Sequence, residues 1–93
     1  MYRAAPSSLF RRQVKRLRRS GRHDIERLEQ VIHALASQEI VTQIYRDHPL
    51  HGKLEGYREC HIAPDWLLIY RIHHAFCLVE LVSTGNHREL FGG

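Results

Sequence analysis

The first third of the chain carries two stretches of apolar residues at helical spacing. In residues 9–17 the apolar positions fall on one helical face, and Arg and Lys fill most of the positions between them. Serines at positions 7 and 8 suit its N-cap and Ser20-Gly21 its end, while Asp24 suits the N-cap of the second stretch. Because only a short turn separates the two predicted helices, we expect a helical hairpin. The apolar positions are Leu9, Phe10, Val14 and Leu17, then Ile25, Leu28, Ile32 and Leu35.

The second half of the chain has the pattern of β-structure. Residues 56–62, 66–72 and 76–82 are three predicted strands, separated by the turn signal Pro64-Asp65 and by a tight connection at His73-His74. The middle strand has apolar residues on both faces, which indicates a central position in a sheet. Residues 2–5 are expected to be extended, residues 40–45 fit no single element, and residues 47–52 are typical of a loop. Residues 84–86 end the last strand, and a short tail at 87–91 follows.

This order of elements predicts one α+β domain over residues 1–93. Consecutive strands with short connections favour a small, mainly antiparallel sheet, with the N-terminal strand and the helical hairpin packed on it. The other face of the sheet would remain for a partner or substrate. A chain of 93 residues supplies one modest core. No apolar run is long enough to cross a membrane, and we see no secretory signal. Cys60 and Cys77 fit buried thiols in a reducing compartment, so we expect a cytoplasmic protein.

Positive charge is concentrated at the start of the sequence. The net charge is +4, and residues 1–22 hold eight Arg or Lys and no acidic residue. Such a stripe attracts polyanions, of which nucleic acid is the commonest. An acidic protein partner, or a helix face that is merely solvated, would account for the stripe equally well. The candidate contact residues are Arg12, Arg16 and Arg19.

Histidine supplies eight of the 93 residues, and six of them lie between positions 48 and 87. Histidine titrates near neutrality and can act as both base and acid. Cleavage of RNA by its own 2′-hydroxyl needs only such a base, such an acid and a cation for the phosphorane. Each candidate also has an ordinary explanation, as a loop histidine, a turn former or half of a surface ion pair. The candidates are His48, His61, Asp65 and His87, with Arg58 as the cation.

Strand geometry and ligand spacing limit these possibilities. On a regular strand Arg58 and His61 point to opposite faces, so they share a cleft only if a bulge intervenes. A metal site is the alternative, because His48 and His51 have an HxxH spacing and Cys60 is also available, together with two further histidines. The tighter ligand pairs of structural zinc sites are not present, so we expect no metal.

One block of residues is more specific than any single histidine. It comprises Asp47-His48-Pro49-Leu50, Gly52, the run 56–62, the run 64–70, Thr84-Gly85-Asn86-His87 and Leu90-Phe91. These segments resemble the YafQ branch of the RelE/ParE superfamily of bacterial type II toxins, and the predicted element order extends the likeness over the whole chain. The resemblance implies a RelE-like fold and a ribosome-dependent endoribonuclease that cuts messenger RNA without a cofactor. It also implies an acidic antitoxin, operator DNA as a partner through that antitoxin, and no membrane.

The resemblance also assigns roles to individual residues. The family's catalytic positions match His48, His61, Asp65 and His87. Either His61 or Asp65 would be the general base and His87 the general acid, while the remaining histidine would position the phosphate. Asp65 could instead orient a histidine and fix its tautomer. Two aromatic residues, Trp66 and Phe91, match positions beside or on the substrate.

Two positions depart from the family pattern. Relatives usually carry Arg where this chain has Ser83, and Thr where it has Asn86. If that arginine stabilises the phosphorane, the task falls here to Arg58 or to an arginine of the basic helix. Because the histidines are intact, we expect activity. The alternative is a catalytically weak or inactive toxin-fold module that binds an antitoxin or nucleic acid.

Overall fold

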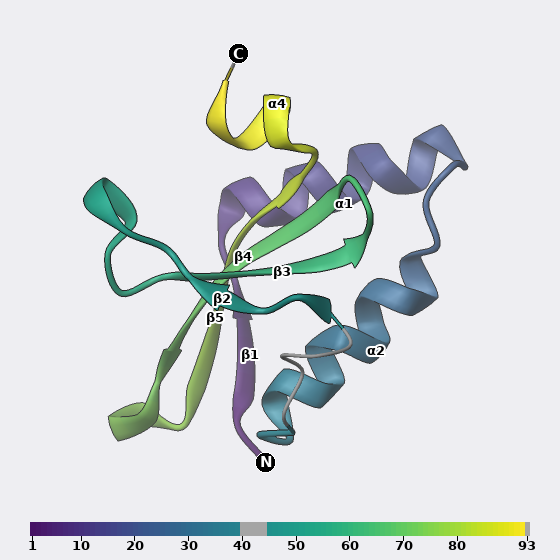
Figure 1. The fold of residues 1–93 in the computed structure, drawn as a ribbon. Coiled ribbons are helices and arrows are strands. Elements are labelled where there is room, and N and C mark those ends of the chain that lie inside the picture. The colour runs from purple at the N-terminus through teal and green to yellow at the C-terminus, as the bar shows by residue number, and fades with distance from the viewer. Residues whose placement is uncertain (40–44, 93) are drawn as a thin grey trace.

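The structure, a computed structural model, describes residues 1–39 and 45–92 and has an α+β fold (Figure 1). Within these residues five strands form one sheet in the order β1-β5-β4-β3-β2. The edge strand β1 pairs in parallel with β5, and the other pairs are antiparallel. The elements are β1 (Arg3–Pro6), α1 (Ser8–Ser20), α2 (Ile25–Ala36), β2 (His48–Pro49), β3 (Arg58–Ala63), β4 (Trp66–His73), β5 (Leu78–Gly85) and α4 (His87–Phe91). The predicted fold class is therefore confirmed.

The helical hairpin forms as its capping residues predict. The Ser7 side chain accepts a hydrogen bond from the backbone N–H of Phe10, and Gly21 follows α1 in the left-handed conformation. Asp24 caps α2 by accepting from the backbone N–H of Arg27. The apolar faces of α1 and α2 pack on one face of the sheet. The buried core residues of this layer are Phe10, Leu17, Leu28, Val31, Leu35, Cys60, Ile62, Trp66, Leu68, Tyr70, Val79 and Leu81.

Five details differ from the sequence-based expectations. Residues 48–49 form a short strand instead of a loop, residues 84–85 continue β5, and the C-terminal tail is helical. The β4–β5 connection contains a 3₁₀ turn at His74–Phe76, so β5 begins only at Leu78. Cys77 is exposed, which corrects the expectation of two buried thiols. Cys60 is fully buried, and burial raises the pKa of its thiol. The ambiguous segment 40–45 lies almost wholly outside the described residues.

No helix in the described part of the chain is long and apolar enough to cross a bilayer.

The second face of the sheet is less open than expected. Leu67, Ile69 and Ser83 point away from the helical layer, yet each is buried. Chain segments therefore fold over this face as well. One of them is the C-terminal α4, which contacts β5 (Figure 1).

A buried carboxylate joins the segment before β2 to the centre of the sheet. Asp47 is 6% exposed and accepts a hydrogen bond from Nε of Arg58 at 2.7 Å. A second guanidinium nitrogen of Arg58 lies 2.5 Å from the same carboxylate oxygen. The Tyr70 hydroxyl donates to the other oxygen, and burial together with this hydrogen bond raises the pKa of that hydroxyl. Because Arg58 and Tyr70 face each other across β3 and β4, Asp47 links three segments at one point.

We predict that Asp47→Ala lowers the free energy of unfolding by about 3 kcal/mol, because it leaves the Arg58 guanidinium without its buried partner. Tyr70→Phe removes one hydrogen bond and should cost about 1 kcal/mol. Urea denaturation followed by circular dichroism measures both values. The matched control is Glu55→Ala, which breaks the exposed pair with His51 and should change stability by less than about 0.5 kcal/mol. Equal losses for Asp47→Ala and Glu55→Ala would refute the anchoring role.

Candidate active site

The candidate site is built on the second face of the sheet by strand register. His48 of β2 pairs with Glu59 of β3, Glu59 with Ile69 of β4, and Ile69 with Ser83 of β5. These four residues form one row across the sheet. His61 lies two residues beyond Glu59 on β3 and therefore points to the same face. The register places two of the predicted histidines side by side.

Glu59 connects those two histidines. Its Oε1 atom lies 3.2 Å from Nε2 of His48 and 3.5 Å from Nε2 of His61. The Glu59 side chain is 4% exposed, whereas the His48 side chain is 49% exposed. The Nδ1 atom of His61 is buried and has no hydrogen-bond partner among the described residues. A buried carboxylate between two imidazoles can fix their tautomers and stabilise their protonated forms.

Sequence reasoning did not single out Glu59. The signal that could have found it was its spacing of two residues from His61, which places both side chains on one strand face. The missing information was its neighbour on β2, because nothing in the sequence indicated that residues 48–49 pair with β3.

His87 and Asp65 reach the same region from two other elements. Asp65 lies in the turn between β3 and β4, and its Oδ1 atom is 3.3 Å from Nδ1 of His87. The rings of His61 and His87 lie 6.0 Å apart between centroids, and the Phe91 ring lies 6.1 Å from that of His87. Both members of the His87–Asp65 pair are exposed to solvent. The four predicted catalytic residues, together with Glu59, thus form a continuous series in the order His48, Glu59, His61, His87, Asp65.

A local capping box holds the helix that carries His87. The Asn86 side chain accepts from the backbone N–H of Glu89, and the Glu89 side chain accepts from the backbone N–H of Asn86. Asn86, where the family usually has Thr, therefore serves as the N-cap of α4. A Cβ atom at Gly85 would lie 2.9 Å from the Glu89 carboxylate, so this turn depends on glycine as well.

Two predicted substrate contacts, Arg58 and Trp66, do not lie among the clustered histidines. Arg58 points to the helix-covered face of β3, opposite His61, and its guanidinium pairs with Asp47. The one register shift in the β3–β4 pairing falls after His61, so it does not bring the two together. We therefore assign Arg58 to the fold and do not propose it as the phosphate cation. Trp66 is buried, and its indole N–H donates to Oγ1 of Thr84 at 2.9 Å.

Two arginines that sequence reasoning did not consider lie near His61. Arg27 of α2 and Arg46, just before Asp47, line a hollow of about 210 Å³ together with His61. Both are far from His61 in the sequence, so only the fold brings them there. They are better placed than Arg58 to attract a phosphate beside this histidine.

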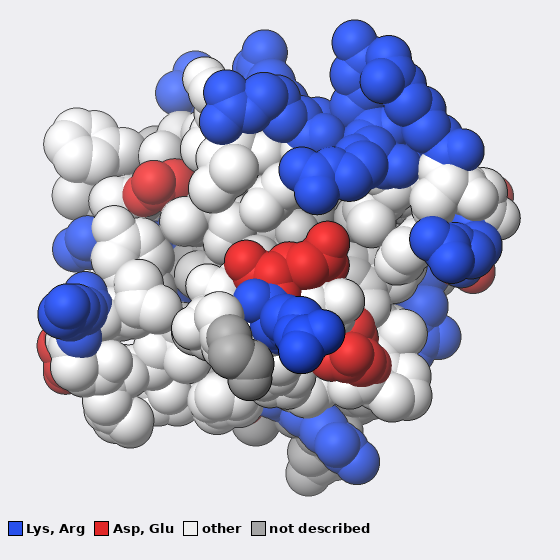
Figure 2. Space-filling view, turned by 90° about the horizontal axis from the view of Figure 1, so that it is seen from above, with Lys and Arg blue, Asp and Glu red and all other residues white. Residues whose placement is uncertain are grey.

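The basic residues of α1 form a surface of their own. Arg12, Arg16 and Arg19 are exposed. Figure 2 shows basic side chains in a broad band on the face along which α1 runs, with a smaller acidic group at the middle of that face. The geometry of this band suits a polyanion.

Three residues of the site have the ligand atoms for a metal ion. One ligand atom each of His48, Glu59 and His61 lie within 4.8 Å of one another. The other residues of the metal alternative do not join them. Cys60 points into the core on the opposite face of β3, and the His51 side chain lies against Glu55. A histidine nitrogen that binds a metal cannot accept a proton. A metal ion bound by His48 and His61 would therefore compete with proton transfer at these residues.

Comparisons with known proteins identify the family of the chain. Residues 2–92 match the family described as the bacterial toxin of the type II toxin–antitoxin system, YafQ. The mRNA interferase toxin YafQ of Escherichia coli K12 is 34% identical over 87 residues, which cover 92% of this chain and 91% of that protein. A metal-bound toxin from Helicobacter pylori is 38% identical and has a TM-score of 0.91, covering 98% of this chain and 100% of that one. The matching chain of the E. coli DinJ–YafQ toxin–antitoxin complex is 33% identical and has a TM-score of 0.84, covering 99% and 100%. The chain therefore belongs to the YafQ family of toxins of bacterial type II toxin–antitoxin systems.

Proposed function

We propose that this protein is an endoribonuclease that cuts messenger RNA on the ribosome through the RNA's own 2′-hydroxyl. The observation that carries the proposal is the series of three histidines and two carboxylates on one side of the sheet, in which neighbours lie within contact distance. Such a series supplies a base, an acid and the groups that orient them. The E. coli relative is named an mRNA interferase, and this chain resembles it over nearly its full length.

The hydrogen bonds suggest how the two steps of proton transfer are divided. Glu59 contacts Nε2 of His61 and orients its ring, and His61 would take the proton of the 2′-hydroxyl. The 2′-oxygen then bonds to phosphorus, and the bond from phosphorus to the 5′-oxygen breaks. His87 gives its proton to that 5′-oxygen, leaving a 2′,3′-cyclic phosphate and a 5′-hydroxyl. Asp65 is occupied by His87, so it orients the acid rather than acting as the base.

The remaining residues would bind and position the RNA. His48 is half exposed beside Glu59 and is available to the phosphate, as are Arg27 and Arg46 in the hollow beside His61. Phe91 on α4 presents an exposed ring next to His87, suited to stack on a base.

The basic band on α1 is the proposed contact for two polyanions. Ribosomal RNA would bind it through phosphate contacts, and an acidic antitoxin would bind it when the toxin is held inactive. The E. coli relative was crystallised with its antitoxin DinJ, which supports an antitoxin partner here. We extend the proposal to operator DNA bound through that partner. Arg12, Arg16 and Arg19 are the proposed contact residues.

We predict that His87→Ala lowers the rate of message cleavage by about 10²- to 10⁴-fold, because it removes the general acid. Primer extension on a message translated in a cell-free bacterial extract measures the cleavage. The matched control is His33→Ala, an exposed histidine of α2 away from the site, which should cut as the wild type does. Equal cleavage by His87→Ala and wild type would reject His87 as the acid.

One observation favours the second candidate function, an inactive or weak module that binds an antitoxin or nucleic acid. Ser83 occupies the row of Glu59 where relatives usually carry Arg, so the site has one cation fewer. If the folded wild type leaves the message uncut in the same extract, the binding module becomes the better account.

Glu59 is proposed as a positioning residue that acts through the two histidines. We predict that Glu59→Gln lowers kcat at least about tenfold with little change in KM, and moves the pH–rate profile, because the amide cannot stabilise a protonated imidazole. Glu59→Asp should restore part of the activity. A loss of activity with an unchanged pH profile would indicate a merely structural role.

Metal-independent catalysis is tested by adding and removing metal. We predict that protein stripped with EDTA and then desalted cuts the message as before, whereas Cu²⁺ inhibits cleavage, because the ion would occupy His48, Glu59 and His61, which include the proposed base and the carboxylate that orients it. The H. pylori relative is described as metal-bound, so occupancy is a realistic state to test. Activity that the stripped and desalted protein lacks and that metal added to the protein restores would overturn the metal-independent mechanism.

A further inference from the structure

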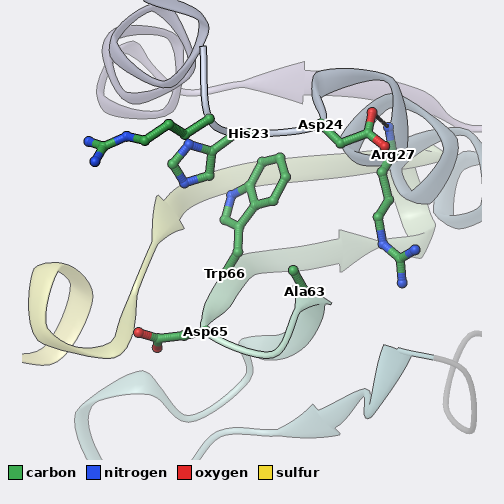
Figure 3. A pocket seen from close by; sticks show the side chains of 7 residues that line it. His23, Asp24, Arg27, Ala63, Asp65 and Trp66 are labelled. Atoms are coloured by element: carbon green, nitrogen blue, oxygen red, sulfur yellow. Dashed lines mark hydrogen bonds between the residues drawn. The ribbon is translucent and has the colours of Figure 1, made fainter. Parts of the chain in front are cut away.

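A second hollow lies on the other side of the β3–β4 turn, and the proposed reaction does not use it. It has a volume of about 360 Å³, within the usual range of small-molecule sites. Its walls come from the α1–α2 connection, the first turn of α2 and the β3–β4 turn (Figure 3). The residues used below are Arg22, His23, Asp24, Arg27, Asp65 and Trp66.

The charges that remain available in this pocket are positive. Asp24 caps α2 by accepting from the backbone of Arg27, and Asp65 is paired with His87. In contrast, the guanidinium groups of Arg22 and Arg27 form no ion pair with the described residues. Arg22 is exposed, and Arg27 donates through Nε to the carbonyl oxygen of Ile62. Both can therefore hold a phosphate.

Two aromatic rings form one wall of the pocket. His23 meets Trp66 edge to face, with ring centroids 4.9 Å apart and the planes 80° apart. In Figure 3 the imidazole of His23 lies directly beside the indole of Trp66, and Arg27 lies on the other side of the indole. Aromatic, histidine and guanidinium planes are the surfaces on which single-stranded RNA bases stack. The aromatic wall therefore suits the base of a nucleotide, and the arginines suit its phosphate.

The position of the pocket indicates which nucleotide it would hold. Arg27 and Ala63 line this pocket and also the hollow beside His61. Asp65 lines the pocket and contacts His87. The two hollows therefore flank one turn, and an RNA strand that places its phosphate between His61 and His87 extends past this turn.

We propose that the pocket binds a nucleotide of single-stranded RNA next to the one that is cut. The base would lie against the His23 ring, which packs edge to face on the buried Trp66, and the phosphate against Arg22 or Arg27. His23 thereby becomes a determinant of base preference at the neighbouring position. The role in cleavage rests on the endoribonuclease function proposed above, whereas nucleotide binding is measurable without it.

Trp66 allows the pocket to be tested directly, because it is the one tryptophan in the sequence. The four nucleoside 5′-monophosphates, uridine and inorganic phosphate are titrated separately into the full-length protein while tryptophan fluorescence is followed. We expect a saturable change with at least one monophosphate, and weaker binding of uridine or phosphate alone. The absence of a saturable change with any monophosphate overturns the proposal.

Matched variants locate the binding. Arg22→Glu should raise the Kd for the monophosphate at least about tenfold, since it replaces an attractive charge with a repulsive one. The control Arg3→Glu makes the same charge change on β1 and should alter Kd less than about twofold. Circular dichroism and urea unfolding verify that each variant is folded. Equal effects of the two variants would mean that binding depends on net charge and not on this pocket, which overturns the proposal.

Cleavage patterns separate this inference from the proposed function. His23→Ala should change which bases flank the cut sites in primer extension, while His33→Ala should not. If the protein cleaves the message but shows no fluorescence change with any nucleotide, the pocket proposal is overturned and the nuclease proposal stands. If nucleotides change the fluorescence but the protein cuts no message, the binding site stands, whereas the nuclease function and the role of the pocket beside the cut are both rejected. Unchanged flanking bases in a folded His23→Ala would reject His23 as a specificity residue.

Discussion

The contacts of the Asp47 carboxylate set the geometry on which the candidate site depends. This buried group binds the side chains of Arg58 and Tyr70 on two neighbouring strands, and His48 is the next residue in the chain. The strand that begins at His48 has only two residues, too few for its own ladder to fix it. The position of His48 relative to Glu59 is therefore determined by a charge that is buried one residue earlier. Such a charge is costly to bury, and its three contacts offset that cost.

Strand β3 serves the fold with one face and the site with the other. Arg58, Cys60 and Ile62 face the helical layer, where they join the core and the Asp47 contact. Glu59 and His61 alternate with them and face the opposite side. Because side chains alternate along a strand, the candidate proton-transfer groups Glu59 and His61 lie within a few ångströms of the core but are not part of it. A substitution on β3 will consequently affect stability where the side chain faces the helices, and chemistry where it faces the candidate site.

Much of the architecture follows from local patterns in the sequence. Helical periodicity and capping residues located α1 and α2, apolar runs located β3, β4 and β5, and strand parity separated Arg58 from His61. The parts that escaped prediction depend on distant contacts. Residues 48–49 are extended because they pair with β3, and Arg27 approaches His61 only because α2 packs on that strand. The helix α4 has five residues, too few for periodicity to reveal, and its capping box depends on Glu89. The candidate catalytic positions came from resemblance to a family, and register explains how two of them, His48 and His61, meet Glu59.

The two cysteines have opposite environments, and this gives the protein a built-in attachment point. Cys60 is sealed in the core with a raised thiol pKa, so it is inert towards thiol reagents in the folded state. Cys77 is exposed at the end of the β4–β5 connection, at the opposite end of the molecule from α4 (Figure 1). A maleimide dye or spin label added to the native chain will therefore react at one site, remote from the candidate catalytic histidines. Its encounter with a ribosome or an antitoxin can then be followed without any engineered residue.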